Sequence, residues 1–186
     1  MRHVISSTFA SLDGVINHMD AWHFAYVDDE ATKIATEQLL ASDALLMGRH
    51  TYDVYAQAWP GRDGEYADKI NSMQKYVAST TLDQVSWANT EIISDDLTGT
   101  VERLRQEPGG DILMHGFGPV ARTLLSAGLL DELHVWVHPA FAGVGGPGDT
   151  LLSEGTSGRL GLVQNRTLAS GVVILSYQVA GPAGQR

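Results

Sequence analysis

The sequence predicts an α/β fold in three layers, with a mostly parallel central sheet, helices on both faces and antiparallel strands at one edge. Up to about residue 127, short apolar runs alternate with helical patterns, the order expected for βα units. Beyond Gly128 the pattern changes, and extended segments at about 159–168 and 172–179 are joined by the hairpin-like pair Ser170-Gly171. We expect one domain over residues 1–180 and a flexible tail over residues 181–186.

The elements can be assigned in order. Residues 2–9 read as a strand, and residues 12–16 as a turn into a second extended piece, whereas residues 17–27 hold aromatic side chains in a polar setting and read as a loop. A helix is predicted from Asp28 to Ser42, because apolar residues recur near helical spacing after two aspartates. The later segments continue the alternation, with strands at 44–47, 75–79, 90–93, 111–115 and 131–138, and helices from about 49, near 65–73, at 97–106 and at 118–127.

Composition excludes several function classes. The chain has 186 residues, enough for one core without disulfides, and it contains no cysteine, which excludes thiol catalysis and Cys-ligated metals. The net charge of −10, without a Lys/Arg cluster, argues against general binding to nucleic acid or to an anionic membrane. No signal-like segment or long apolar run occurs, so we expect a cytoplasmic protein with a small-molecule substrate.

Residues 44–53 are the most informative stretch. An apolar strand breaks at Gly48, and Arg49 and Thr51 follow at the start of a helix. The free N–H groups of the helix, the Thr51 hydroxyl and the Arg49 guanidinium would then converge on one point, which suits a phosphate. A motif this short also occurs by chance, so its weight depends on a second turn of the same kind.

That second turn spans residues 112–122. A strand ends at His115, Gly116 and Gly118 bracket Phe117, and Pro119 stands at the expected first helical position. Glycines there let a pyrophosphate lie against the backbone, whereas an ordinary βα turn would also need glycine for its dihedral angles. The two readings have similar weight for this turn alone, but two such turns on one sheet favour a dinucleotide.

A third candidate follows the strand at residues 75–79. Its end carries the hydroxyls of Ser79, Thr80 and Thr81, which could contact a ribose or a 2′-phosphate. The alternative, favoured for this segment alone, is that they cap the strand end and turn the chain.

Together these motifs resemble the dihydrofolate-reductase-like superfamily, and more specifically the reductase domain of riboflavin biosynthesis. The resemblance rests on the Leu-Asp-Gly loop, the segment at 46–52, the segment at 75–80 and the later strand–Gly-x-Gly–helix, with residues 128–135, His138-Pro139 and residues 143–146 typical of that branch. It implies NADPH as the hydride donor, bound by Gly48, Arg49, Thr51, Ser79, Thr80, Gly116, Phe117, Gly118 and Pro119. It also implies a homodimer, which we expect to bury part of the strand at residues 133–137 and of the Gly-rich segment after it.

The chain also departs from these relatives. Dihydrofolate reductases carry two adjacent glycines where this chain has His115-Gly116, and their acidic residue early in the first helix is matched only approximately by Asp28. The fused zinc deaminase of many riboflavin enzymes is absent from this chain. Dihydrofolate is therefore a poor candidate substrate, and 5-amino-6-(5-phosphoribosylamino)uracil is compatible without being indicated.

The candidate catalytic residues are Asp28 and Asp13. A carboxylate beside Trp22, Phe24 and Tyr26, the expected substrate-binding aromatics, could bind a heterocycle and supply a proton if buried. Structural roles compete, since an aspartate at a helix start caps it and Asp-Gly is a common turn pair. The histidines show no ligand spacing, so we expect no metal.

Two functions remain open at this stage. The first is an NADPH-dependent reductase that transfers a hydride to a C=O or C=N group of a small, heterocyclic or ribosyl substrate. The second is a non-catalytic, dimeric nucleotide-binding scaffold that kept the cofactor cleft and lost turnover. The presence of both the cofactor turns and the aromatic segment favours the first.

Overall fold

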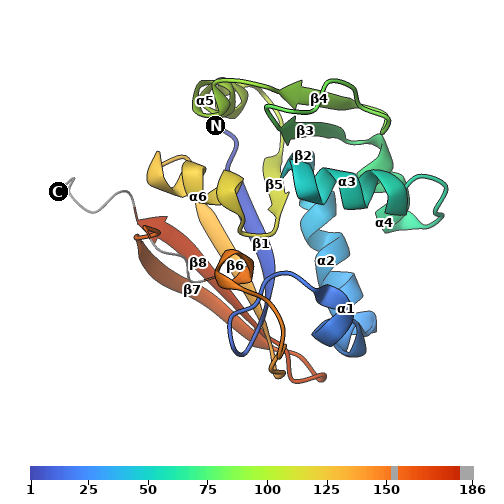
Figure 1. Cartoon of the computed structure of the whole chain (residues 1–186), viewed down its shortest axis with the longest axis vertical. Coiled ribbons are helices and arrows are strands. Elements are labelled where there is room, and N and C mark those ends of the chain that lie inside the picture. Colours follow the sequence, from blue (N-terminus) through green and yellow to red (C-terminus); the bar gives the residue numbers. More distant parts are fainter. Residues whose placement is uncertain (152–154, 181–186) are drawn as a thin grey trace.

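The computed structural model describes residues 1–151 and 155–180, and the expected tail at 181–186 lies outside the described residues. Within the described ranges eight strands form one sheet (Figure 1). Their order across the sheet is β4 (Thr90–Ile93), β3 (Gln74–Ala78), β2 (Ser42–Gly48), β5 (Asp111–His115), β1 (Val4–Ser11), β6 (Glu132–His138), β8 (Val173–Ala180) and β7 (Arg159–Thr167). Strands β1 to β6 run parallel to one another, whereas β8 pairs antiparallel with β6 and with β7.

Helices cover both faces of the sheet, which confirms the three-layer arrangement (Figure 1). They are α1 (Met19–Trp22), α2 (Asp29–Ala41), α3 (Arg49–Ala58), α4 (Glu65–Ser72), α5 (Leu97–Gln106) and α6 (Pro119–Ser126), with 3₁₀ turns η1 (Phe24–Tyr26) and η2 (Pro147–Asp149). The assignment follows from strand periodicity, because neighbouring strand residues point to opposite faces. In β2, Ala44 and Leu46 pack with α5 and α6, whereas Leu45 and Met47 pack with α2, α3 and α4.

A buried lysine joins α4 to β3. Lys75 is fully buried, and its ammonium donates hydrogen bonds to the carbonyl oxygens of Ile70, Asn71 and Met73 at 3.1, 3.0 and 2.7 Å. The same ammonium lies 4.6 Å from the centre of the Trp87 ring. These carbonyls belong to the last turn of α4 and its exit, where the helix has no N–H donors of its own. Lys75 thus caps a helix from the neighbouring strand.

The carboxyl-terminal hairpin forms as expected, with Gly171 at φ +87° in its turn. Strand β7 pairs only with β8, and all nine of its residues are exposed. Strand β6, in contrast, lies between β1 and β8, with Val135 and Trp136 buried. The expected subunit contact at residues 133–137 stays a prediction, and it would use a face of β6, because the outer strands of the sheet are β4 and β7.

The expected loop at residues 17–27 is also wrong, since it contains α1 and η1. His18 adopts a left-handed conformation before α1, with φ 55°. The Trp22 indole N–H then donates to the carbonyl of Asn17 at 2.9 Å, and Trp22 is buried. Such short helices depend on these tertiary contacts rather than on a repeating apolar pattern, so periodicity does not reveal them.

Candidate functional site

The candidate site lies at the edge where the parallel strands β1 to β6 end. Ligands of open α/β sheets bind outside the carboxyl ends of the strands, where the chain leaves toward different helices. Strand β2 ends at Gly48 and continues into α3, while the neighbouring β5 ends at His115 and continues through Gly116 into α6. The two expected anion turns therefore stand on adjacent strands.

The amino-terminal ends of α3 and α6 meet at this edge. A Cβ atom added to Gly48 would lie 3.3 Å from Val120 Cγ2 on α6, so glycine permits close packing of the two turns. Gly48 and Gly118 are the N-cap residues, and neither helix has a side-chain cap. A helix start leaves several backbone N–H groups without helical partners. Two sets of such donors thus point toward one region of the sheet edge.

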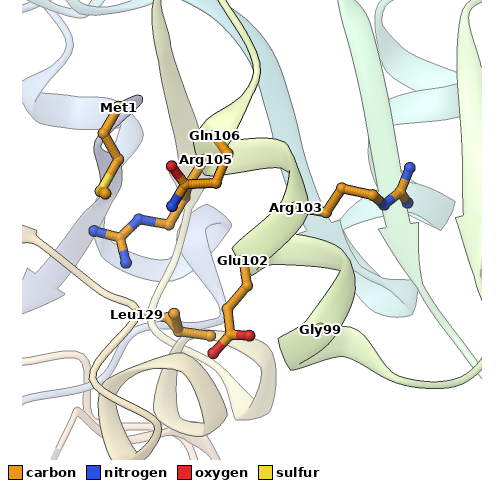
Figure 2. A pocket seen from close by; sticks show the side chains of 7 residues that line it. All are labelled: Met1, Gly99, Glu102, Arg103, Arg105, Gln106 and Leu129. Atoms are coloured by element: carbon orange, nitrogen blue, oxygen red, sulfur yellow. The ribbon is translucent and has the colours of Figure 1, made fainter.

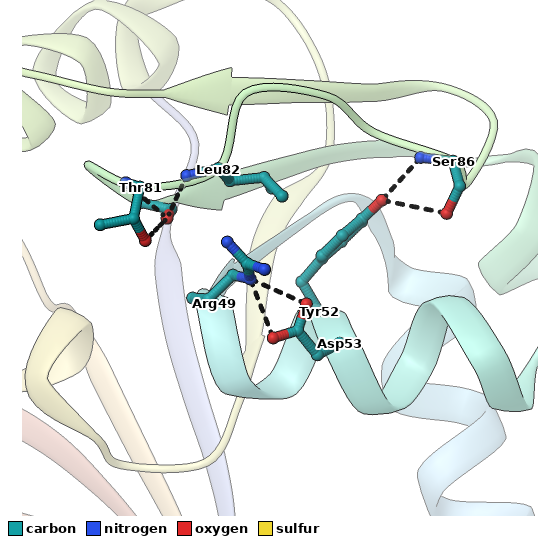
Figure 3. A network of polar contacts seen from close by, with 7 residues as sticks. Arg49, Tyr52, Asp53, Thr81, Leu82 and Ser86 are labelled. Carbon is teal, nitrogen blue, oxygen red and sulfur yellow. Dashed lines mark hydrogen bonds and ion pairs between the residues drawn. The ribbon is translucent and has the colours of Figure 1, made fainter.

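Arg49 stands at the first position of α3 and is half-exposed. Its Nε atom donates to both carboxylate oxygens of Asp53 at 2.8 Å, an ion pair between successive turns. Figure 3 shows the guanidinium pointing from α3 toward the segment that carries Thr81 and Leu82. Its two terminal nitrogens have no partner among the described residues and can bind an anion while Asp53 orients the group.

The hydroxyl segment after β3 has a structural role. The Ser79 hydroxyl oxygen accepts hydrogen bonds from the backbone N–H groups of Thr81 and Leu82 at 3.2 and 3.1 Å, while Thr80 is exposed. Tyr52 anchors the following loop, because its hydroxyl accepts the Ser86 N–H at 2.8 Å (Figure 3). In the structure Ser79 therefore turns the chain after β3, as the alternative interpretation predicts.

The second anion turn combines an open side and a buried side. Gly116 has φ +94°, a conformation that favours glycine, and a Cβ atom at Gly116 or Gly118 would meet nothing within 4 Å. Pro119 occupies the first helical position as expected. The Phe117 side chain is buried in the core, so only its backbone can contact a ligand here.

A tyrosine–histidine pair lies beside this turn and has no counterpart in the sequence-based expectation. The Tyr55 hydroxyl and His115 Nδ1 share a hydrogen bond of 3.1 Å. Burial raises the pKa of Tyr55 to about 12 and lowers the pKa of His115 to about 4, so both groups are neutral near pH 7. The pair joins α3 to the end of β5, between the two anion turns.

Both candidate aspartates are engaged in local structure. Asp28 is the N-cap of α2 and accepts the Ala31 N–H at 2.7 Å. Asp13 is exposed and accepts the Ser11 hydroxyl at 2.5 Å and the Ala142 N–H at 3.0 Å. These hydrogen bonds, led by the one from Ser11, lower the pKa of Asp13, which favours its ionised form. Asp13 is thus held in an exposed turn, and Asp28 is used as a helix cap.

The three expected substrate aromatics lie in different settings. Trp22 is buried, Phe24 is 66% exposed, and Tyr26 is half-buried with its hydroxyl donating to the Pro139 carbonyl at 3.2 Å. They surround a pair of buried histidines, His23 and His138, whose ring nitrogens lie 2.9 Å apart. Neither histidine is a candidate site residue from the sequence, because 115 positions separate them.

The described cavities do not coincide with this edge. One of about 570 Å³ lies near the amino terminus and is lined by Met1, Leu129 and residues of α5 (Figure 2). Arg105 in its wall pairs with Asp131 at 2.6 Å. Among residues 1–151 and 155–180, no group of three or more His, Asp or Glu side chains is placed to hold a metal ion. No helix in these ranges is long and apolar enough to cross a membrane.

The sheet order and the two helix layers match the fold of dihydrofolate reductase. Dihydrofolate reductase from Enterococcus faecalis, complexed with NADP(H), matches with a TM-score of 0.62 at 13% identity, over 95% of this chain and 96% of that chain. A Shewanella sp. PV-4 structure named as a riboflavin biosynthesis protein matches with a TM-score of 0.69 at 21% identity, over 96% of this chain and 99% of that one.

Sequence comparison gives the family. The model of the RibD C-terminal domain matches residues 2–174. The uncharacterized protein YyaP of Bacillus subtilis (strain 168) is 31% identical over 152 residues, which is 78% of this chain and 79% of that protein. The chain belongs to the RibD C-terminal domain family, and its fold is reductase-like.

Proposed function

We propose that the protein is an NADPH-dependent oxidoreductase that reduces a C=O or C=N group of a small, heterocyclic or ribosyl substrate. The observation that carries this proposal is the meeting of two uncapped helix amino termini, α3 and α6, on adjacent strands. A pyrophosphate accepts hydrogen bonds from such N–H groups and is stabilised by the positive ends of both helix dipoles. The E. faecalis neighbour, which has the same fold, is complexed with NADP(H).

The residues at this edge fit a dinucleotide. Gly116 and Gly118 leave open space beside the backbone, which allows phosphate oxygens to approach the α6 terminus. Arg49 offers its terminal nitrogens, and the hydroxyls of Thr51 and Thr80 are available for ribose or phosphate oxygens. When bound, the nicotinamide supplies the hydride, so the main contribution of the protein is to hold the nicotinamide and the reducible group of the substrate close together and correctly oriented.

The substrate would lie between the cofactor and the segment at residues 17–27. Phe24 and Tyr26 expose aromatic surface on this segment, with the buried Trp22 packed behind them on His138, and they suit a planar ligand. Because Asp28 caps α2 and Asp13 accepts hydrogen bonds from Ser11 and Ala142, water delivers the proton in this proposal, and Asp28 serves at most to orient it. The likeness to a 5-amino-6-(5-phosphoribosylamino)uracil reductase from Thermotoga maritima suggests compounds of that kind as the first substrates to test.

Two measurements test the proposal. Titration of the protein into NADPH, followed by nicotinamide fluorescence, should show saturable binding, with NADH weaker if Arg49 contacts a 2′-phosphate. A panel of carbonyl and imine heterocycles should then include one that accelerates NADPH oxidation. Absence of NADPH binding would refute the proposal. Binding without turnover across the panel would support the nucleotide-binding scaffold instead.

We also propose that the protein is a homodimer that pairs through β7. This strand forms an open edge, and it exposes Leu160, Leu162 and Val163 at 43%, 52% and 61%. A long edge strand with apolar side chains is a template for pairing with a second chain. Light scattering at micromolar concentration should give about 40 kDa, twice the 20.0 kDa chain, and a Leu162→Lys variant should shift it toward the monomer. A mass near 20.0 kDa for the unmodified protein would exclude this arrangement.

A further inference from the structure

The buried histidine pair stands at the substrate end of the proposed site and has no part in the reaction as described so far. His138 is the last residue of β6 and is 2% exposed. His23 lies between α1 and η1 and is 9% exposed. The hydrogen bond between His23 Nδ1 and His138 Nε2 joins the carboxyl edge of the sheet to the segment that carries the aromatic residues.

The surroundings fix which nitrogen of each ring carries the proton. His138 Nδ1 lies 3.0 Å from the carbonyl oxygen of Trp136, which can only accept, so this nitrogen must carry a proton. In neutral His138 the Nε2 atom is then an acceptor. His23 must therefore donate from Nδ1, and its own Nε2 is left as an acceptor. The Trp136 carbonyl thus sets the tautomer of both rings.

The outer nitrogen of the pair is free to meet a ligand. His23 Nε2 has no hydrogen-bond partner among the described residues. Within the described residues, the polar side-chain atoms that are buried without a hydrogen-bond partner are Arg105 Nε, Arg122 Nε and Ser170 Oγ. His23 Nε2 is not one of them, so it is accessible to solvent. His23 Nε2 therefore reaches the surface of an otherwise buried ring, as expected for an acceptor directed at something outside the protein.

The pair is set in an aromatic wall. The His23 ring stacks on Phe9 with centroids 4.2 Å apart and an interplanar angle of 27°, and Trp22 and Phe24 meet it edge-on. Burial, and next the neighbouring His138, lower the pKa of His23 to about 4. The ring is thus neutral at physiological pH and keeps an acceptor, not a donor, at Nε2.

We propose that His23 Nε2 recognises a ring N–H or hydroxyl group of the reducible ligand, and that His138 is a positioning residue that holds His23 in the accepting tautomer. The inference rests on the proposed reductase function and narrows its substrate class to planar compounds that carry a hydrogen-bond donor beside the reducible group. A ligand that lacks a donor would displace water from this acceptor and leave it unpaired among aromatic rings. Ligands whose donor is methylated should therefore bind more weakly.

The tautomers can be measured directly. Long-range ¹H–¹⁵N correlation spectra should show both His23 and His138 protonated at Nδ1 near pH 7. In His138→Phe, His23 loses the acceptor for its Nδ1–H and should populate both tautomers. His138→Gln should restore the Nδ1–H form of His23, because an amide oxygen can accept that hydrogen bond. His23 protonated at Nε2 in the unmodified protein, or unchanged in His138→Phe, would overturn the inference.

Ligand recognition is tested with 2-quinolone, which carries one ring N–H, and its N-methyl derivative, which carries none. We expect the unmodified protein and a His3→Phe control to bind 2-quinolone about three- to tenfold more tightly than they bind its N-methyl derivative. Binding of 2-quinolone should also change the ¹⁵N chemical shift of His23 Nε2. In His23→Phe the ratio should fall to about one. Equal binding of the two compounds by the unmodified protein would refute the inference, and so would an unchanged affinity ratio in His23→Phe. An unchanged ¹⁵N shift of His23 Nε2 at the highest soluble concentration of 2-quinolone would also refute it.

The same samples separate this inference from the proposed function. NADPH binding is measured alongside, and it should be equal in the unmodified protein, His3→Phe and His23→Phe, because the cofactor turns lie on other strands. A protein that distinguishes the two quinolones but does not bind NADPH would refute the reductase proposal alone. A protein that binds NADPH but does not distinguish the quinolones would refute the role of His23 alone.

Discussion

Replacement of Lys75 by methionine tests whether the buried ammonium stabilises the fold. Methionine keeps the apolar stem and removes three hydrogen bonds, two of them to the fully buried carbonyls of Ile70 and Met73. A buried acceptor left unpaired costs about 1–3 kcal/mol. Release of the ammonium from its buried setting offsets part of this cost, and that setting already lowers the pKa of Lys75 to about 8. We expect a net loss of about 2–4 kcal/mol in the free energy of unfolding.

Thermal unfolding followed by circular dichroism provides the measurement. For a chain of this size about 2–4 °C accompany each kcal/mol, so Lys75→Met should lower Tm by roughly 5–15 °C. The matched control is Lys33→Met, since the Lys33 side chain is 76% exposed and pairs only weakly with Glu37. The control should unfold within a degree or two of the unmodified protein. An unchanged or higher Tm in Lys75→Met would show that burial of the charge costs more than its three hydrogen bonds return.

Three further outcomes are expected. Arg49→Ala should weaken NADPH binding in fluorescence titration about ten- to hundredfold, which is the value of one charged hydrogen bond. Its Tm should be nearly unchanged, because the ion pair of Arg49 with Asp53 is exposed. Unaltered NADPH affinity would show that Arg49 does not contact the cofactor. Asp28→Asn should keep Tm and turnover near those of the unmodified protein, since asparagine caps as well, whereas a hundredfold loss of turnover would identify Asp28 as the acid. The free energy of unfolding should fall as pH drops from about 6.5 toward 4, because the unfolded chain takes up protons at His23 and His115 at a higher pH than the folded chain does. The loss by pH 5 is about 2 kcal/mol per histidine. Denaturant midpoints that do not change over this pH range would contradict the prediction.

The sequence predicts the regular part of this fold closely, because its elements follow simple periodic patterns. The helix at 97–106 and the strand at 111–115 have the same bounds in the structure, and the antiparallel hairpin at the carboxyl end of the sheet is also confirmed. Regular helices and strands bury one face, and the spacing of apolar residues in the sequence indicates that face directly. The short helices within residues 17–27 have no such repeat, and they form where Trp22 finds a partner in Asn17.

The candidate site divides in the same way. The glycine turns at Gly48 and Gly116 could be located because each is a local event, a strand end followed by a helix start. The hydrogen-bonded pairs could not be located, since 60 positions separate Tyr55 from His115. Spacing does not reveal which segments become neighbours, and only that placement brings the rings of His23 and His138 within 2.9 Å of each other.

The position of β1 in the sheet has a consequence for how the protein is made. This strand is synthesised first, yet its two neighbours are β5, at Asp111–His115, and β6, at Glu132–His138. On the ribosome β1 therefore waits, without either pairing partner, until most of the chain has emerged. Such long-range pairing slows folding and leaves an unpaired strand exposed to other chains. The nascent chain should accordingly depend on a chaperone, or on slow translation past residue 138, more than a protein with a local hairpin at its amino terminus.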